Sequence, residues 1–162
     1  MQRTCQIFFF EYDRMDALVA DEQQLLQAAH RAVEKAYAPY SRFRVGAAAW
    51  LSNKAVVSGA NFENAAYPMC LCAERATLAA AFSQYPNERI VALAVVAVSD
   101  TQLISYPVTP CGACRQVLLE VEQKFGHPIR LILRGQTGPT WVFARASDLL
   151  PLGFDAGMMR LI

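Results

Sequence analysis

The first regular pattern of hydrophobic and polar positions along the chain begins near Asp21. Asp21 followed three residues later by Gln24 resembles a capping box, which marks the start of a helix. Apolar side chains then recur at helical spacing, at Leu25, Leu26, Ala29, Ala32, Val33, Ala36 and Tyr37. We therefore expect an amphipathic helix from about Asp21 to Tyr37.

Shorter apolar runs farther along the chain predict strands. Residues 90–98 form nine apolar positions without alternation, as expected for a strand covered on both faces. Asn53, in the polar Ser52–Lys54 interval, tolerates the positive φ of a tight hairpin turn. The remaining predicted strands are residues 43–51, 55–61, 130–133 and 140–144, the last two separated by a Gly- and Pro-containing turn.

Two further helices are expected at residues 72–82 and 111–125, the second with Val117, Leu118 and Val121 directed inward. The resulting order is α-β-β-α-β-α-β-β. This order predicts an α/β fold with three layers, α/β/α, around a mixed sheet of roughly five strands.

The chain of 162 residues is the size of one ordinary domain. We expect a single domain over residues 16–162, preceded by an N-terminal extension of unknown role at residues 1–15. The cluster Phe8, Phe9 and Phe10 in this extension is consistent with an added edge strand, a disordered lead or sequence upstream of a true start at Met15.

Charge and cysteine usage narrow the class of protein. Fifteen basic and 14 acidic residues give a formal net charge of +1, which provides no broad field for a polynucleotide and suits a small, nearly neutral substrate. No apolar run approaches a membrane span. Five cysteines, three of them in metal-like spacing, do not suggest a secreted disulfide framework. We expect a soluble cytoplasmic protein without polynucleotide or membrane partners.

The chemistry-bearing residues lie in two short motifs. Cys72-Ala73-Glu74-Arg75 is followed, 39 residues after its cysteine, by Pro110-Cys111-Gly112-Ala113-Cys114-Arg115. Cys-x-Glu followed by Pro-Cys-x-x-Cys is the form of zinc-dependent nucleobase deaminases. Three protein ligands leave one tetrahedral position of Zn²⁺ open, which indicates a catalytic rather than a structural ion.

The predicted helices bring these motifs together. Cys72 at the start of one helix and Cys111 with Cys114 at the start of the next can converge on a single ion. Zn²⁺ with three thiolates carries a formal charge of −1, which weakens its power to acidify water. Arg75 and Arg115 are placed to donate hydrogen bonds to the sulfurs and withdraw this charge, although either is also compatible with an exposed helix face.

Two upstream blocks make the resemblance specific. Asn61-Phe62-Glu63-Asn64-Ala65 precedes Cys72, and Tyr40-Ser41-Arg42-Phe43-Arg44-Val45-Gly46-Ala47-Ala48 lies before that block. With the cysteine motifs, they resemble the small, homotetrameric, zinc-dependent cytidine deaminase family from about Ala36 to Phe154. The sequence departs from the family at Arg44, often proline, and at Cys70, often glycine.

The resemblance implies one zinc ion per chain, held by Cys72, Cys111 and Cys114, and hydrolysis of cytidine and deoxycytidine in pyrimidine salvage. Glu74 is then the proton carrier for attack of an activated water on C4 of the cytosine ring. Further positions carried over are substrate contacts or lie near the subunit junction: Phe43, which packs on the pyrimidine; Asn61 and Glu63, which hold the ribose 3′-hydroxyl; Ala73 and Tyr67; and Phe154, which reaches a neighbouring subunit's site.

Purely structural roles stay open for several of these residues. Asn61 and Glu63 are also typical of turn chemistry at a strand end, Phe43 is also a typical core residue, and Cys70 reads best as a bystander thiol. Competing functions are a deaminase of another cytosine nucleoside, such as an antibiotic, and a polynucleotide-editing deaminase. A structural zinc module would need Cys70 as a fourth ligand.

Overall fold

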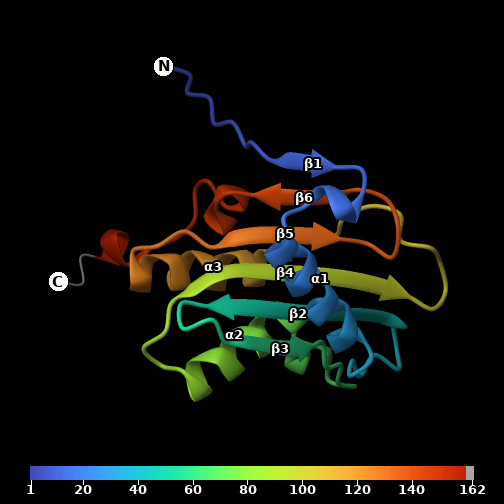
Figure 1. The fold of residues 1–162 in the computed structure, drawn as a ribbon. Coiled ribbons are helices and arrows are strands. Elements are labelled where there is room, and N and C mark those ends of the chain that lie inside the picture. The colour runs from blue at the N-terminus through green and yellow to red at the C-terminus, as the bar shows by residue number, and fades with distance from the viewer. Residues whose placement is uncertain (160–162) are drawn as a thin grey trace.

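The computed structural model describes residues 1–159 and contains one six-stranded mixed sheet (Figure 1). Its spatial order is β1-β6-β5-β4-β2-β3. Only β4 and β5 pair in parallel among the described strands, and the other neighbours are antiparallel. The strands are β1 (Phe10–Tyr12), β2 (Phe43–Leu51), β3 (Val56–Ala60), β4 (Ile90–Ser99), β5 (Arg130–Arg134) and β6 (Thr140–Phe143).

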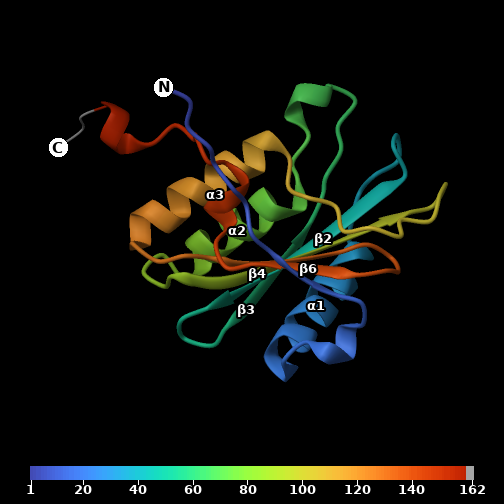
Figure 2. The ribbon, with the colours of Figure 1, turned by 90° about the horizontal axis from the view of Figure 1, so that it is seen from above.

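Helices cover both faces of the sheet. Helix α1 (Ala20–Val33) lies on one face, and α2 (Ala73–Gln84) and α3 (Gly112–Phe125) lie together on the other (Figure 2). The 3-10 turns are Met15–Ala17, Tyr67–Met69, Ala146–Leu149 and Ala156–Met159. This arrangement confirms the three-layer α/β/α prediction.

The central strand β4 separates two hydrophobic cores. Leu93 and Val95 point into the core beneath α2 and α3, whereas Ala94 and Val96 point into the core beneath α1. All four are buried, with at most 3% of their surface exposed. The unbroken apolar run therefore has the two-sided burial that its pattern predicts.

Small residues let α2 approach the sheet closely. A Cβ added at Gly59 of β3 would lie 2.8 Å from the backbone nitrogen of Thr77 in α2. The Thr77 hydroxyl donates a hydrogen bond to the carbonyl of Ala47 in β2, 3.2 Å away. These contacts fix α2 across β2 and β3, so that its N-terminus opens toward the ends of these strands.

The first helix differs from its prediction at both ends. It begins at Ala20 with Val19 as N-cap and no side-chain cap, so the expected capping box at Asp21 is wrong. It ends at Val33 because Tyr37 is drawn into backbone pairing: its nitrogen donates to the Asn61 carbonyl at 3.0 Å, and its carbonyl accepts from the Glu63 nitrogen at 2.8 Å.

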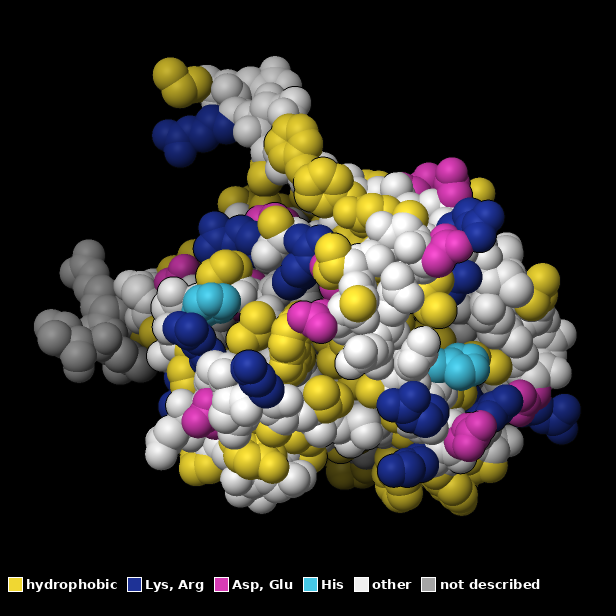
Figure 3. Space-filling model, viewed as in Figure 1, with side chains coloured by type: hydrophobic (Ala, Val, Ile, Leu, Met, Phe, Trp, Pro, Cys, Tyr) yellow, Lys and Arg dark blue, Asp and Glu magenta, His cyan; other side chains and the backbone are white. Residues whose placement is uncertain are grey.

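The N-terminal extension supplies the sixth strand that the sequence prediction of roughly five did not include. β1 pairs antiparallel with β6. Phe9, just before β1, stacks on Phe143 at a centroid distance of 5.2 Å and makes a tilted contact with Trp141 at 5.0 Å. Of the three interpretations of the Phe cluster, the structure shows the edge strand, which begins at Phe10, the last residue of the cluster. Hydrophobic side chains follow this projecting segment to the sheet edge (Figure 3).

No helix in the described part of the chain is both long and apolar enough to cross a membrane.

Candidate active site

Three cysteine side chains meet at the N-terminal ends of α2 and α3. The Sγ atoms of Cys72, Cys111 and Cys114 all lie within 4.8 Å of one another, with 3.7 Å between Cys72 and Cys111 and 3.5 Å between Cys111 and Cys114. Thiolates about 2.3 Å from a tetrahedral zinc ion lie about 3.8 Å apart. The sulfurs therefore already have the spacing that Zn²⁺ requires, and the predicted convergence of the two motifs is confirmed.

Helix termini produce this convergence. Cys72 and Cys111 are the N-cap residues of α2 and α3, with extended backbone conformations and no capping hydrogen bond from either side chain. Cys114 lies in the first turn of α3 and is buried. Because the positive ends of both helix dipoles face the sulfurs, the site favours thiolates and a bound cation held by them.

The thiols compete for protons. Hydrogen bonds from Cys114 and Cys111, together with Arg75, lower the pKa of Cys72 to about 5 despite its partial burial. The hydrogen bond to Cys72, burial and the nearby Glu74 carboxylate raise the pKa of Cys114. Without a metal, one thiolate thus forms at the expense of its neighbour, and binding of Zn²⁺ displaces the remaining protons.

Glu74 lies beside the sulfurs in the first turn of α2 and exposes 5% of its surface. Burial raises the pKa of its carboxyl, and the negative charge of Cys72 adds to this effect. A carboxyl with a raised pKa exchanges protons more readily near neutral pH than an ordinary glutamate.

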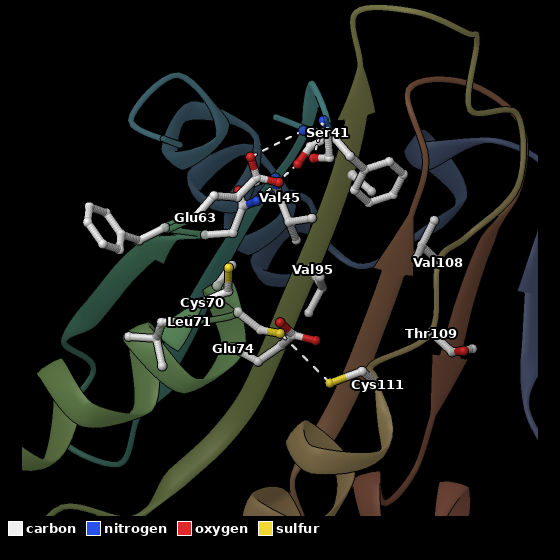
Figure 4. Close-up of a pocket in the computed structure, with 16 residues that line it drawn as sticks. Ser41, Val45, Glu63, Cys70, Leu71, Glu74, Val95, Val108, Thr109 and Cys111 are labelled. Atoms are coloured by element: carbon white, nitrogen blue, oxygen red, sulfur yellow. Dashed lines mark hydrogen bonds between the residues drawn. The ribbon is translucent and has the colours of Figure 1, made fainter. Parts of the chain in front are cut away.

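A cavity of about 430 Å³ opens in front of the cysteines, within the usual size range of small-molecule sites. Glu63 and Ser41 lie at one end of it, and Glu74 and Cys111 at the other (Figure 4). Its lining residues are Ser41, Phe43, Val45, Asn61, Phe62, Glu63, Cys70, Leu71, Cys72, Ala73, Glu74, Val95, Ala97, Val108, Thr109 and Cys111.

Glu63 is held by the turn that precedes β2. Its Oε2 accepts hydrogen bonds from the backbone nitrogens of Tyr40 at 2.9 Å and Ser41 at 3.3 Å. A hydrogen bond from the Ser41 hydroxyl lowers the pKa of Glu63, with further help from the two backbone donors. The carboxylate therefore stays ionised at neutral pH.

Asn61 extends the β2–β3 pairing into the cavity wall. Its Oδ1 accepts from the Val45 nitrogen at 2.8 Å, and its Nδ2 donates to the Phe43 carbonyl at 2.9 Å. These two bonds fix the orientation of the amide and leave one acceptor position and one N–H for another partner.

The other predicted substrate residues divide into two groups. Phe43 and Ala73 line the cavity. Tyr67 and Phe154 do not line it: Tyr67 is 69% exposed and contacts Tyr40 edge-on at 6.1 Å, while Phe154 is 55% exposed. Neither aromatic reaches the cavity of its own chain.

The two arginines next to the motifs have different surroundings. Burial lowers the pKa of Arg75, but hydrogen bonding and charge from Cys72 and Cys114 raise it by more. Its Nη2 donates to the Cys70 carbonyl at 3.2 Å, and its buried Nε has no partner within the described chain. Arg75 therefore lies close enough for the charge of Cys72 and Cys114 to raise its pKa, while its hydrogen bond to a sulfur stays a prediction.

The hydrogen-bond partners of Arg115 are oxygen atoms. Its Nε donates to the Pro110 carbonyl at 2.7 Å, Nη1 to the Leu149 carbonyl at 3.0 Å, and Nη2 to the Thr109 hydroxyl at 3.0 Å. The hydrogen bond to a thiolate that we expected is replaced by three bonds to oxygen. The side chain extends along the loop before Cys111 rather than toward the sulfurs.

Sequence reasoning missed part of the cavity wall. Ser41 lies within one of the blocks that carry the family resemblance, so its position was a usable signal. No signal in the sequence pointed to Val108 and Thr109, because they lie in an irregular loop without periodicity. Cys70 also lines the cavity, where its Sγ accepts from the Asn64 nitrogen at 3.3 Å, but it is not part of the metal-ligating group.

Comparisons with known proteins agree with this geometry. The sequence model of the family described as "Cytidine and deoxycytidylate deaminase zinc-binding region" matches residues 19–125. The cytidine deaminase of Halalkalibacterium halodurans is 50% identical over 101 residues, which cover 62% of this chain and 72% of the relative. That of Mycobacterium tuberculosis is 44% identical over 137 residues, covering 83% and 90%.

Solved structures extend the similarity to the fold. The cytidine deaminase from Burkholderia pseudomallei matches with a TM-score of 0.69 at 41% identity, covering 81% of this chain and 97% of that one. The Mycobacterium tuberculosis enzyme matches with a TM-score of 0.63 at 37% identity, covering 84% and 98%. The chain therefore belongs to the cytidine and deoxycytidylate deaminase family.

Proposed function

We propose that this protein hydrolyses cytidine and 2′-deoxycytidine, with one water consumed, to uridine and 2′-deoxyuridine, releasing ammonia. The observation that carries the proposal is one cavity with two chemically distinct ends. Three cysteines spaced for zinc and a buried glutamate occupy one end, and an ionised carboxylate beside a fixed amide occupies the other. This pairing fits a polar base at the first end and a sugar at the second.

Cys72, Cys111 and Cys114 would hold Zn²⁺, which when bound supplies Lewis acidity that activates water for attack on C4. Glu74 accepts a proton from the attacking water and delivers one to the ring nitrogen. It then takes the proton of the new C4 hydroxyl and carries it to the amino group, which leaves as ammonia when the C4–N bond breaks. The raised pKa of Glu74 suits these successive roles because the carboxyl must both take and return protons.

Glu63 and Asn61 provide the sugar end. One oxygen of Glu63 is occupied by backbone donors, so its other oxygen can accept a hydroxyl hydrogen bond. A base without its sugar would cover these polar groups without pairing them, at a desolvation cost. A phosphate near the carboxylate would be repelled. Phe43 lines the same cavity and offers an aromatic face to the pyrimidine.

Incubating the zinc-loaded protein separately with cytidine, deoxycytidine, cytosine and cytidine monophosphate tests the proposal by loss of aminopyrimidine absorbance. Both nucleosides should react, while cytosine and the monophosphate should be poorer by a factor of about 10² or more in kcat/KM. Turnover of free cytosine comparable with that of cytidine would show that the sugar contacts are misassigned.

Other functions fit the site less well. A deaminase of a nucleoside antibiotic would not be expected to keep the Asn61–Glu63 block. A structural zinc module needs a fourth ligand, but the Cys70 thiol is engaged with the Asn64 backbone. Cys70→Ser should therefore retain zinc, and loss of metal from this variant would support the structural module. On the face seen in Figure 3, basic and acidic side chains are interspersed, which gives a polynucleotide no basic stripe there.

We also propose that the active unit is a homotetramer in which Phe154 completes a neighbour's site. Phe154 and Tyr67 are exposed aromatics outside the cavity of their own chain. Phe62, which lines the cavity, and Tyr40, beside Glu63, are also half exposed. With 54% hydrophobic and 18% charged residues, the chain has less charge than a typical soluble domain. These features support burial of apolar surface between subunits.

Subunit mixing tests the shared site. Inactive Glu74→Gln chains carry an intact Phe154, and Phe154→Ala chains carry an intact Glu74. Phe154→Ala alone should weaken nucleoside binding without disturbing metal content. Hybrids of the two should regain activity at composite sites, above that of either variant alone. Light scattering that finds a fully active monomer, or subunit exchange without rescue, would contradict the shared-site proposal.

We also propose a role in pyrimidine salvage in the cytoplasm, which the proposed substrates and the cysteine chemistry support. All five cysteines are free thiols in the structure. A reducing compartment keeps the three zinc-spaced thiols from oxidation to disulfides.

A further inference from the structure

The loop that leads into Cys111 has little backbone support of its own. Residues 105–110 form no helix or strand, and they make no backbone–backbone hydrogen bond with the described chain. Pro107 and Pro110 have no N–H to donate. Yet Val108 and Thr109 of this loop line the cavity, and Cys111, the residue that follows the loop, is one of the zinc-spaced cysteines.

Arg115 supplies the missing support. Its Nε donates to the Pro110 carbonyl at 2.7 Å and its Nη2 to the Thr109 hydroxyl at 3.0 Å. These are the hydrogen bonds that residues 105–110 make within the described part of the chain. Pro110 is buried, so its carbonyl depends on this donor.

The same side chain connects the loop to the C-terminal region. Arg115 Nη1 donates to the Leu149 carbonyl at 3.0 Å, and the neighbouring Gln116 Nε2 donates to the Phe154 carbonyl at 2.6 Å. The first turn of α3 therefore contacts the loop wall of the cavity and residues 149–154 as well as carrying Cys114.

We propose that Arg115 is a positioning residue which fixes the Thr109–Pro110 segment, and through it Cys111, against the C-terminal region. It acts through backbone geometry and not by contact with a sulfur. The inference builds on the proposed function, because it assigns Arg115 to the same zinc site and substrate cavity.

Arginine suits this position because its planar fork presents donors in several directions at once. All three guanidinium nitrogens have a separate oxygen partner here. Lysine has the charge but carries a single nitrogen, which cannot span the three oxygens. Glutamine is shorter and uncharged, and it leaves the Pro110 carbonyl without a donor.

The test compares zinc-loaded wild type with Arg115→Gln and Arg115→Lys. Arg130→Gln is the control, because Arg130 is another partly exposed arginine, paired with Glu22 of α1 on the opposite face of the sheet. Zinc release to a chromogenic chelator, amide hydrogen exchange of residues 115–118 in the first hydrogen-bonded turn of α3, thermal stability, and kcat and KM for cytidine are measured for each protein.

Arg115→Gln should release zinc about 10- to 100-fold faster and lose kcat/KM in the same range, as changes beside metal ligands do. Exchange should accelerate at residues 115–118, whose amides bond back to the segment beginning at Cys111, but not in β4. Arg115→Lys should fall between wild type and Arg115→Gln. Arg130→Gln should lose thermal stability while keeping wild-type zinc release and wild-type exchange at residues 115–118.

Wild-type zinc release and wild-type exchange at residues 115–118 in both Arg115 variants would overturn the proposal, as would changes no greater than those of Arg130→Gln. If Arg115→Gln does not fold, Arg115→Lys decides by the same two measurements. A wild-type protein that binds zinc but leaves cytidine unchanged would refute the proposed function alone, because zinc release and exchange still test the role of Arg115.

Discussion

Replacing Glu74 by glutamine removes the proposed proton carrier while keeping its size and polarity. No other residue of the cavity is placed to replace it. The only other carboxylate among the cavity-lining residues is Glu63, at the opposite end, where hydrogen bonds lower its pKa and make it a poor proton donor. The loss should therefore be close to the full contribution of general acid–base catalysis.

The magnitude follows from the number of proton transfers. General acid–base catalysis by one group contributes about 10²- to 10⁴-fold. Because Glu74 is assigned transfers at the water, the ring nitrogen and the leaving amine, we expect the upper end. A loss of about 10⁴-fold in kcat corresponds to about 5 kcal/mol of transition-state stabilisation.

The same Glu74→Gln substitution should lower activity without lowering the stability of the metal-free protein near neutral pH. The pKa of Glu74 is raised by burial, so the folded protein holds this proton more tightly than the unfolded chain. Its contribution to stability is then present below the unfolded value of about 4.3 and is lost as pH rises through the folded pKa. Above that range, the metal-free Glu74→Gln protein should be at least as stable as metal-free wild type.

The assay combines single-turnover deamination of cytidine, zinc content and thermal unfolding. Glu120→Gln, which neutralises an exposed carboxylate on α3, is the control for loss of one negative charge. Glu74→Gln should keep one zinc per chain and bind nucleoside. Turnover within tenfold of wild type in the zinc-loaded variant would refute the assignment of Glu74 as proton carrier.

Three further predictions follow from other parts of the molecule. Alanine at Cys72 or Cys111 should abolish both zinc binding and activity, and a variant with a full equivalent of tightly bound zinc would contradict the ligand assignment. Glu63→Gln should raise KM for cytidine more than it lowers kcat. Because the folded pKa of Glu63 is lowered, the stabilisation by its charge is present above the unfolded value of about 4.3 and is lost as pH falls through the folded pKa. The free energies of unfolding of the two proteins in urea should therefore converge as pH falls below about 4.3. Phe9→Ala should cost about 1–2 kcal/mol by removing two aromatic contacts, whereas Phe8→Ala, 75% exposed, should cost under about 0.5 kcal/mol in urea unfolding.

Local patterns predicted the elements that depend on local causes. The uninterrupted apolar run of β4 requires cover on both faces, and the structure has it. The cysteine motifs predicted their own convergence because both occur where helices begin. In each case the determining interaction lies within one element or at its end.

Long-range pairing explains what the sequence did not reveal. The end of α1 depends on backbone bonds between Tyr37 and the segment after β3, which no periodicity before Tyr37 reports. The sixth strand depends on its register with β6, where Phe10 lies opposite Val142. Periodicity could show only that the Phe cluster was compatible with a strand.

Arg115 illustrates the same limit within the site. Because Arg115 follows Cys114 in sequence, a sulfur was the expected hydrogen-bond partner. The partners of a long side chain depend, however, on which acceptors the fold places within its reach. The Leu149 carbonyl, 34 residues away, becomes available only when the turn at 146–149 packs against α3. The Pro110 carbonyl competes more strongly than a sulfur, because a buried carbonyl without a donor is costly. Arg75 has different surroundings: its Nη2 donates to the Cys70 carbonyl, but Cys72 and Cys114 raise its pKa and its buried Nε has no partner in the described chain. Two arginines in similar motif positions thus acquire different roles, one facing the charge of the thiolates and the other fixing the loop that holds a ligand.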